Sequence, residues 1–224
     1  MKKSKMDHDK LLRQAIHQAV RMWSAPEYER FLHRKKPGKL NEDEDKFNWN
    51  WFKWFVRDWS VARNIKKERR EDVRVCLDTN FRDLLASEDI KGVVVDKMAK
   101  KIRVNGWCSK KSENGNGPLS LVSKIGFFFK PNILIPYDSF GRDGLKKLGV
   151  PRNETKSYAG YLKAFDRKFK LHKKEIKNAL KEPWVKALAR KYRCPVKCLK
   201  LPSIRRKVFD NYLVALGRGN SDKT

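Results

Sequence analysis

Residues 115–149, GNGPLSLVSKIGFFFKPNILIPYDSFGRDGLKKLG, carry the clearest structural pattern in this chain. A turn of Gly and Asn opens the stretch, and Pro118 suits the first turn of a helix whose apolar residues continue to Phe129. A short apolar connector then leads to Asp138, which precedes a second helix that Gly149 closes. The pattern therefore predicts two helices joined by an extended connector, with a carboxylate at the start of the second helix.

Helical spacing of apolar residues extends over most of the remaining chain. We find no alternating pattern of strand type, no internal repeat and no long linker. The sequence predicts an all-α fold, one compact domain of about nine to ten helices that spans residues 1–224, with residues 1–8 and 218–224 frayed. Apart from the two helices above, the expected helices cover residues 11–23, 28–32, 52–59, 73–85, 94–102, 158–181, 183–192 and 203–216.

The chain is strongly basic, with 54 Lys and Arg against 26 Asp and Glu and a formal net charge of +28. Such an excess repels itself in a folded protein, so it favours a polyanionic partner, and nucleic acid is the first candidate. The basic residues are spread along the chain instead of lying beside an apolar helix face, which argues against a membrane surface. Basic runs at residues 34–36, 66–70 and 205–207 are expected to form solvated faces, some of them along the nucleic acid.

The sequence also indicates where the protein works. No apolar stretch of signal-peptide type follows the early lysines, and no stretch is long enough to span a bilayer. Four Cys without a regular spacing indicate free thiols in a reducing compartment. These observations predict a cytoplasmic protein without a membrane partner.

The order of Gly-rich turn, apolar helix, connector, Asp and second helix resembles the catalytic core of the helix-hairpin-helix (HhH-GPD) DNA glycosylase superfamily. The resemblance covers residues 115–149 and is closest in residues 135–149. It implies a helix-hairpin-helix element and an enzyme that binds double-stranded DNA as a monomer, flips out a damaged or modified base and hydrolyses its N-glycosidic bond. The abasic product would belong to base excision repair or to defence against phage DNA that carries modified bases.

Within this resemblance Asp138 is the catalytic residue. Cleavage of an N-glycosidic bond passes through a sugar with oxocarbenium-like charge. A carboxylate beside the sugar can either stabilise that charge or align a water for attack. The dipole of the following helix would keep Asp138 ionised. Backbone N–H groups of the Gly-rich turn would hold a DNA phosphate. The implied DNA-binding residues are Gly115, Asn116, Gly117, Ser120 and Lys124.

The chain departs from the family pattern around the hairpin. The family hairpin usually reads Leu-Pro-Gly-x-Gly, whereas residues 113–118 read Glu-Asn-Gly-Asn-Gly-Pro. Members that also nick the DNA carry a Lys where ungapped counting back from Asp138 finds Ser120. We therefore expect a hydrolytic, monofunctional enzyme, with Lys124, one helical turn further along, as the secondary catalytic candidate.

Ligands for a cofactor are sparse in the sequence. Some family members bind an iron–sulfur cluster through four Cys near the C-terminus, but this chain offers only Cys194 and Cys198 there, so no cluster is expected. A second pair of zinc ligands does not lie near these two Cys. The His residues are scattered along the chain, at His8, His17, His33 and His172, so a zinc site is not expected. The expected reaction requires no metal and no organic cofactor.

Aromatic and polar residues outside this core are candidates for contacts with the extruded base. Trp107 lies in a polar loop, where it could either stack on a flipped base or dock on the core. The candidates for the base pocket are Trp107, Tyr137, Ser139 and Tyr212, with core packing as the alternative for Tyr212. The family often inserts a wedge residue into the DNA from an N-terminal loop, and the candidates here are Asn48, Trp49 and Asn50.

Two other functions fit the sequence. A lone Asp before a helix is commonly an N-cap, so the chain could be a non-catalytic DNA- or RNA-binding helix-hairpin-helix module in which Asp138 only caps. A basic RNA-binding or ribosome-associated protein would rest on charge alone. The pattern on both sides of Asp138 favours the glycosylase.

Overall fold

Nine α-helices form the part of the chain that the computed structural model describes, which is residues 2–24, 49–59, 61, 65–85, 92–109 and 117–219. These helices are α1 (Lys2–Trp23), α3 (Trp49–Asp58), α4 (Arg70–Leu85), α5 (Val93–Val104), α7 (Gly117–Phe129), α8 (Ser139–Lys147), α9 (Tyr158–Ala179), α10 (Pro183–Lys191) and α11 (Pro202–Arg218). Short 3-10 segments are η2 (Lys67–Arg69), η3 (Arg152–Thr155) and η4 (Val196–Lys200). Within the described ranges the only β pairing is an isolated bridge between Ile65 and Cys108, so the predicted all-α class is confirmed.

Residues 2–8, for which the sequence predicts fraying, belong to helix α1 in the structure. Helix α1 begins at Lys2, and His8 is hydrogen-bonded to Tyr212 on α11 and to Glu175 on α9. Polar contacts with distant helices hold this end of α1, whereas the sequence pattern showed only the apolar residues that begin at Leu11. The helix expected at residues 28–32 lies outside the described residues.

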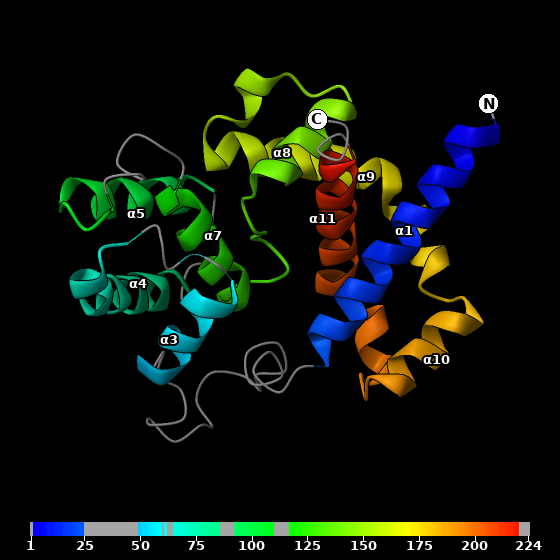
Figure 1. The fold of residues 1–224 in the computed structure, drawn as a ribbon, viewed down its shortest axis with the longest axis horizontal. Helices are drawn as coiled ribbons and strands as arrows, with labels where there is room; N and C mark the ends of the chain where they lie inside the picture. The colour runs from blue at the N-terminus through cyan, green and yellow to red at the C-terminus, as the bar shows by residue number, and fades with distance from the viewer. Residues whose placement is uncertain are drawn as a thin grey trace.

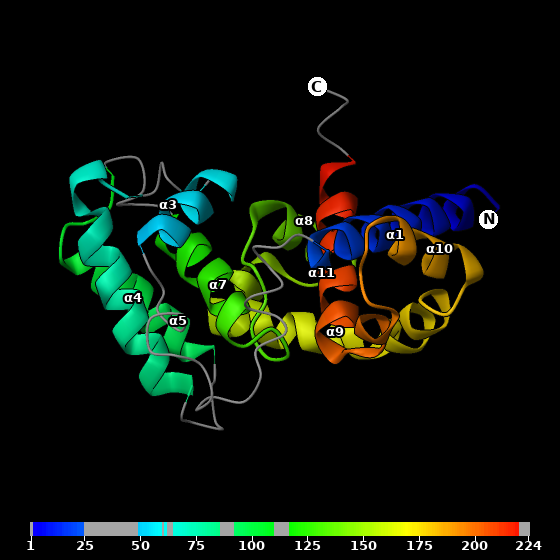
Figure 2. The same cartoon turned by 90° about the horizontal axis from the view of Figure 1, so that it is seen from below.

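The helices form two groups, which Figures 1 and 2 show side by side from two directions. One group holds α3, α4, α5 and α7, and the other holds α1, α8, α9, α10 and α11. In the second group α11 contacts α1, α8 and α9, so it lies at the centre. In the first group α7 contacts α4 and α5.

The aromatic segment packs as its spacing predicts. Phe52, Phe55 and Val56 share one face of α3 and are buried. The ring of Phe55 meets Phe128 of α7 edge-on, with centroids 5.5 Å apart. Helix α7 is apolar around most of its circumference and is therefore enclosed. Within the described part of the chain no helix combines the length and apolarity needed to cross a bilayer.

A carboxylate joins the two groups. Asp96 on α5 accepts hydrogen bonds from the backbone N–H of Tyr158 (2.8 Å) and of Ala159 (2.9 Å), which are the first two residues of α9. Gly92, just before α5, lies against the backbone of Ala159, where a Cβ would be only 2.8 Å from the Cα atom. The carboxylate satisfies N–H groups that the start of a helix leaves free, and it orients α9 relative to α5.

Two glycines allow α8 and α11 to meet at their backbones. A Cβ on Gly144 of α8 would collide with the carbonyl of Leu213 on α11, and a Cβ on Gly217 of α11 would collide with the carbonyl of Phe140 on α8. A side chain at either position would force the helices apart. This close packing fixes the first turn of α8 against α11.

Candidate active site

The connector between α7 and α8 is held by side chains from distant helices. The carbonyl of Ile133 accepts a hydrogen bond from Nη2 of Arg206 on α11 at 2.8 Å. The hydroxyl of Tyr158 on α9 accepts from the N–H of Ile135 at 2.9 Å and donates to its carbonyl at 2.8 Å. These bonds satisfy backbone groups that a buried extended segment could not pair by itself. The connector therefore delivers the residue that follows it to a defined place.

Tyr137 ends the connector and is an anchor in the core. Its N–H donates to Oγ of Ser123 on α7 at 2.8 Å, and its hydroxyl donates to the carbonyl of Thr155 at 3.0 Å. Its ring meets Tyr161 edge-on at 5.0 Å, and burial raises the pKa of the Tyr137 phenol. The structure thus places this base-pocket candidate inside the protein, where it positions the next residue.

Asp138 stands at the N-cap of α8, as the sequence pattern predicts. Its backbone is extended (φ −133°, ψ 146°), and its Oδ1 accepts a hydrogen bond from the N–H of Phe140 at 2.8 Å. The side chain is half-buried, and within the described residues no group donates to Oδ2. A cap of this kind stabilises a helix by about 1 kcal/mol. The cap uses only Oδ1 of the carboxylate.

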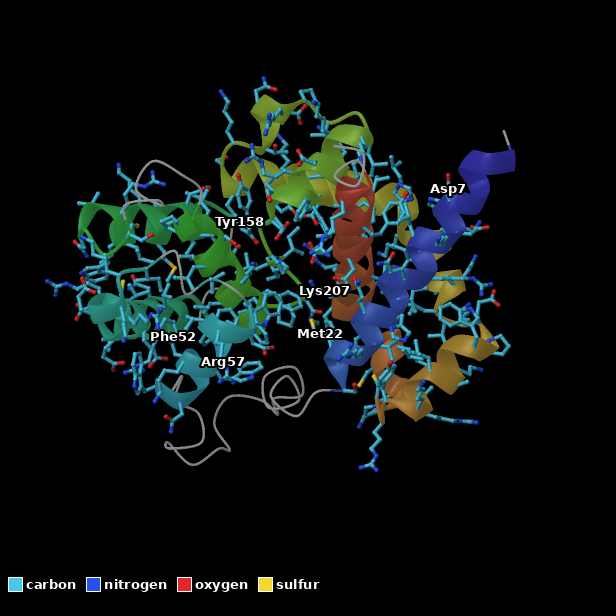
Figure 3. The ribbon with its side chains drawn as sticks, viewed as in Figure 1. Asp7, Met22, Phe52, Arg57, Tyr158 and Lys207 are labelled. Atoms are coloured by element: carbon cyan, nitrogen blue, oxygen red, sulfur yellow. The ribbon has the colours of Figure 1, made fainter. Side chains whose placement is uncertain are left out.

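A buried ion pair on α11 lies near Asp138. Nζ of Lys207 is 2.5 Å from Oδ2 of Asp210, and the two residues are only 7% and 1% exposed. The ammonium also lies 5.5 Å from the ring centroid of Trp59 and 5.7 Å from that of Phe127. Figure 3 shows Lys207 on α11, and the contacts with Trp59 and Phe127 place its ammonium toward the group that contains α3 and α7.

The basic run at residues 205–207 therefore differs from the solvated face that the sequence predicted. Arg206 and Lys207 are both buried, because α11 is surrounded by α1, α8 and α9. Arg206 pairs with Asp166 of α9 and lies over the ring of Phe165. Because α11 lies in the centre of the second helix group, Arg206 and Lys207 are buried and do not form a solvated face.

Four charged groups interact at this place. Burial raises the pKa of Asp210, and the negative charge of Asp138 raises it further. The positive charges of Lys207 and of Lys124 on α7 lower the same pKa. Oδ1 of Asp210 is buried and has no hydrogen-bond partner among the described residues. Because taking two charges out of water is costly, a buried pair beside a second carboxylate points to function more than to stability.

The indole ring of Trp59 lies next to both Lys124 and Lys207. Nζ of Lys124 donates to the carbonyl of Trp59 at 3.4 Å and lies 5.9 Å from its ring centroid. The same ring carries the contact with Lys207 described above, and it packs on Phe55 and Phe128. Both lysines are thus held next to one indole at the junction of α3, α7 and α11.

Tyr161 lies beneath the first turn of α8. Its hydroxyl is buried without a hydrogen-bond partner among the described residues, and a Cβ on Gly141 would lie 2.6 Å from it. The pKa of this phenol is raised well above its ordinary value, mainly by burial and then by Asp210 and Asp138.

We define the candidate active site by its four charged residues and the two aromatic residues beside them: Asp138, Lys124, Lys207, Asp210, Trp59 and Tyr161.

The other predicted site residues lie in several places. Ser139 is exposed beside Asp138, and Ser120 is half-buried on α7, where its carbonyl accepts from Ser123 Oγ at 3.2 Å. Trp107 follows α5, and its partly buried ring packs on the core. Tyr212 faces α1 and α9, where its hydroxyl contacts Nδ1 of His8 at 2.9 Å. The hydroxyl of Tyr212 therefore points to a different cluster from the candidate active site.

The wedge and hairpin predictions fall partly outside the described residues. Trp49 opens α3, is 36% exposed and stacks on Phe52, while Asn50 is exposed beside it. Asn48, Gly115 and Asn116 lie outside the described residues, and Gly117 is the first residue of α7. The helix-hairpin-helix element therefore stays a prediction.

Sequence reasoning did not assign Lys207, Trp59 and Tyr161 to the site. One signal was present, because Lys207 and Asp210 are three residues apart in a helix whose neighbouring positions, such as Val208 and Phe209, are apolar. Opposite charges at that spacing on an apolar background indicate a buried pair. No comparable signal marks Trp59 or Tyr161, whose places depend on helix packing.

Comparison with protein-family models, with curated proteins and with solved structures finds no match to this chain. The function must therefore be argued from the site itself.

Proposed function

We propose that this protein is a DNA N-glycosylase that flips out a damaged or modified base and hydrolyses its N-glycosidic bond, leaving an abasic site. The observation that carries the proposal is the position of Asp138, a half-buried carboxylate at the start of α8 beside Lys124 and the Lys207–Asp210 pair. The net charge of +28 supports a polyanionic substrate. The resemblance of residues 115–149 to the glycosylase core supports the reaction.

The chemistry follows from the two oxygens of Asp138. Oδ1 accepts a hydrogen bond from the N–H of Phe140, which leaves Oδ2 for the substrate. As the bond from the sugar to the base breaks, the base leaves with the electron pair and the sugar becomes cationic. Asp138 stabilises that cation and aligns the water whose oxygen bonds to the sugar carbon and whose proton is released.

The two lysines favour water as the nucleophile. Lys207 is paired with Asp210, and an ammonium ion held by a carboxylate has no lone pair with which to attack the sugar. Lys124 donates to the carbonyl of Trp59 and lies near the surface of the site, where it contacts the DNA strand. Borohydride trapping checks this assignment, because a covalent adduct at either lysine would contradict the hydrolytic mechanism.

The decisive experiment compares Asp138→Asn with Asp143→Asn. Asn is as good an N-cap as Asp, so Asp138→Asn keeps α8 intact and removes only the charge. Asp143 lies in the same helix, so Asp143→Asn matches the change in net charge. Duplexes that carry assorted modified bases are incubated with each protein and treated with alkali, which breaks the strand at abasic sites.

The wild-type chain and Asp143→Asn are expected to produce breaks on at least one substrate. Asp138→Asn should lose about 100-fold or more in rate while still binding DNA. The rival function is a DNA-binding module in which Asp138 serves only as the observed cap. Binding by all three proteins without a break on any substrate would favour that module.

A further inference from the structure

A second polar cluster lies where α1 crosses α9 and α11. His8 and Asp9 of α1 and Glu175 of α9 each bring one nitrogen or oxygen, and these three atoms lie within 4.8 Å of one another. Nε2 of His8 is 2.6 Å from Oε1 of Glu175. The cluster is partly open, with 27% of the His8 side chain and 43% of the Glu175 side chain exposed.

Two neighbouring side chains orient these groups from behind. The hydroxyl of Tyr212 lies 2.9 Å from Nδ1 of His8, which leaves Nε2 to face Glu175. Nδ1 of His172 is 3.4 Å from Oε2 of Glu175, the oxygen that His8 does not contact. Imidazole and carboxylate ligands of metal ions are commonly held in this way by a hydrogen bond to the atom that does not bind the metal.

The cluster also borders a groove. Asp9 and Glu175 are among the lining residues of a cavity of about 670 Å³ between α1, α9 and α10, which Arg13 and Trp184 also line. Ligands other than protein groups can therefore reach the cluster. Figure 3 labels Asp7, the residue before His8, near the start of α1, and Lys207 on α11 at a distance from it. The cluster is therefore separate from the candidate active site.

We propose that His8, Asp9 and Glu175 form a binding site for a divalent transition-metal ion of the zinc class. One imidazole and two carboxylates suit zinc, and three protein ligands leave a fourth position open to water in the groove. The cation replaces the proton between Nε2 and Glu175, and the neutral ring keeps its proton on Nδ1, where it donates to Tyr212. Ligand atoms of a tetrahedral zinc ion are about 3.3 Å apart. Nε2 and Oε1 are now 2.6 Å apart, and all three ligand atoms lie within 4.8 Å of one another, so the long, partly exposed Glu175 side chain must rotate to reach that spacing.

A titration of the full chain without an affinity tag tests the site. The protein is stripped of metal and titrated with Zn²⁺ in a calorimeter and with Co²⁺ in a spectrophotometer. We expect one ion per chain and Co²⁺ bands without a sulfur charge-transfer band. His8→Gln and Glu175→Gln should each weaken binding by about tenfold or more.

His17→Gln is the matched control. His17 is also on α1 and also contacts a tyrosine hydroxyl, Tyr192 at 3.1 Å, but within the described residues no carboxylate forms an ion pair with it. This variant should bind Zn²⁺ as the wild-type chain does. If the other variants lose structure, NMR of the wild-type chain decides, since Zn²⁺ should shift the imidazole signals of His8 and not those of His17.

Three results would overturn the proposal. They are no binding at about 1 mM Zn²⁺, a Co²⁺ spectrum with a sulfur charge-transfer band that places the ion at Cys194 and Cys198, or binding that His8→Gln and Glu175→Gln leave unchanged.

Discussion

Lys207 and Asp210 carry opposite charges in a place that water scarcely reaches. A buried pair gains Coulomb energy but loses the hydration of both ions, so it contributes little to net stability. Its chemical consequence is larger. The pair sets two charges next to Asp138 and Lys124, and it leaves Oδ1 of Asp210 buried in the same cluster without a partner among the described residues.

A mutant cycle on this pair separates stability from function. Lys207→Met leaves the Asp210 carboxylate buried and unpaired, and it should lower the free energy of unfolding by about 3–5 kcal/mol. The double variant Lys207→Met/Asp210→Leu should be about as stable as the wild-type chain, or more stable, because it removes both charges. Urea unfolding measures both values, and the double variant should have lost base excision.

The ion pair between Arg74 and Glu71 on α4, in which the side chains are 17% and 52% exposed, is the control for that cycle. Arg74 and Glu71 have the same spacing of three residues, with nitrogen and oxygen 2.7 Å apart. Glu71→Gln should cost at most about 1 kcal/mol, because the Glu71 carboxylate is half-exposed. A double variant at Lys207 and Asp210 that stays as unstable as Lys207→Met would show that the pair supports the fold.

At the scale of the elements, the contact between α8 and α11 decides where Asp138 points. Helix α8 is short, so its own hydrogen bonds could not hold it in place. The backbone contacts at Gly144 and Gly217 hold it against α11, and Nζ of Lys147 donates to the carbonyl of Leu216 at 2.5 Å. Small changes in this packing would move Asp138 relative to Asp210.

Gly144→Ala tests the importance of that contact. Ala is favoured over Gly in a helix by about 1 kcal/mol, so a free helix would gain stability. Here the added methyl collides with the carbonyl of Leu213, and we expect a loss of about 1–3 kcal/mol in the free energy of unfolding, measured in urea. Base excision should fall as well, because α8 must shift.

Gly219→Ala provides the comparison. A Cβ on Gly219 would have no neighbour closer than 3.7 Å, so this substitution should leave stability nearly unchanged. Equal stability of Gly144→Ala and the wild-type chain would mean that α8 can move away from α11 without cost.

At the scale of the whole molecule, the charge of +28 is the dominant property. The candidate active site itself is close to neutral, because its two lysines balance its two aspartates. The excess of positive charge must therefore act elsewhere on the surface. On the proposed function it contacts the phosphates of a duplex and so contributes affinity without regard to sequence.

Salt dependence measures those phosphate contacts. If about 6–10 phosphates are neutralised, affinity for a short duplex should fall by about 10³–10⁵-fold between about 50 and 200 mM salt. Lys124→Gln should reduce the slope of log affinity against log salt by about one. Lys174 lines the groove near the proposed cation site, so Lys174→Gln should leave the slope unchanged. Stronger binding to duplex RNA than to DNA would contradict the proposed substrate.

Local patterns allowed much of this protein to be predicted from its sequence. The helical class, the helices from residue 117 onward and the N-cap position of Asp138 depend on periodicity, capping and turn residues within a few positions of one another. Such interactions form wherever the local sequence permits them. The basic excess, which favours a polyanionic partner, is likewise a property of composition alone.

The tertiary structure decided which charges meet. His8 and Glu175 are 167 positions apart, and Lys124 of α7 is far in sequence from Asp210 of α11. Their proximity depends on which face each helix buries and on the close approach that Gly144 and Gly217 allow. Those choices minimise the free energy of the whole packed core. A contact that no local interaction encodes is settled only when the helices have packed.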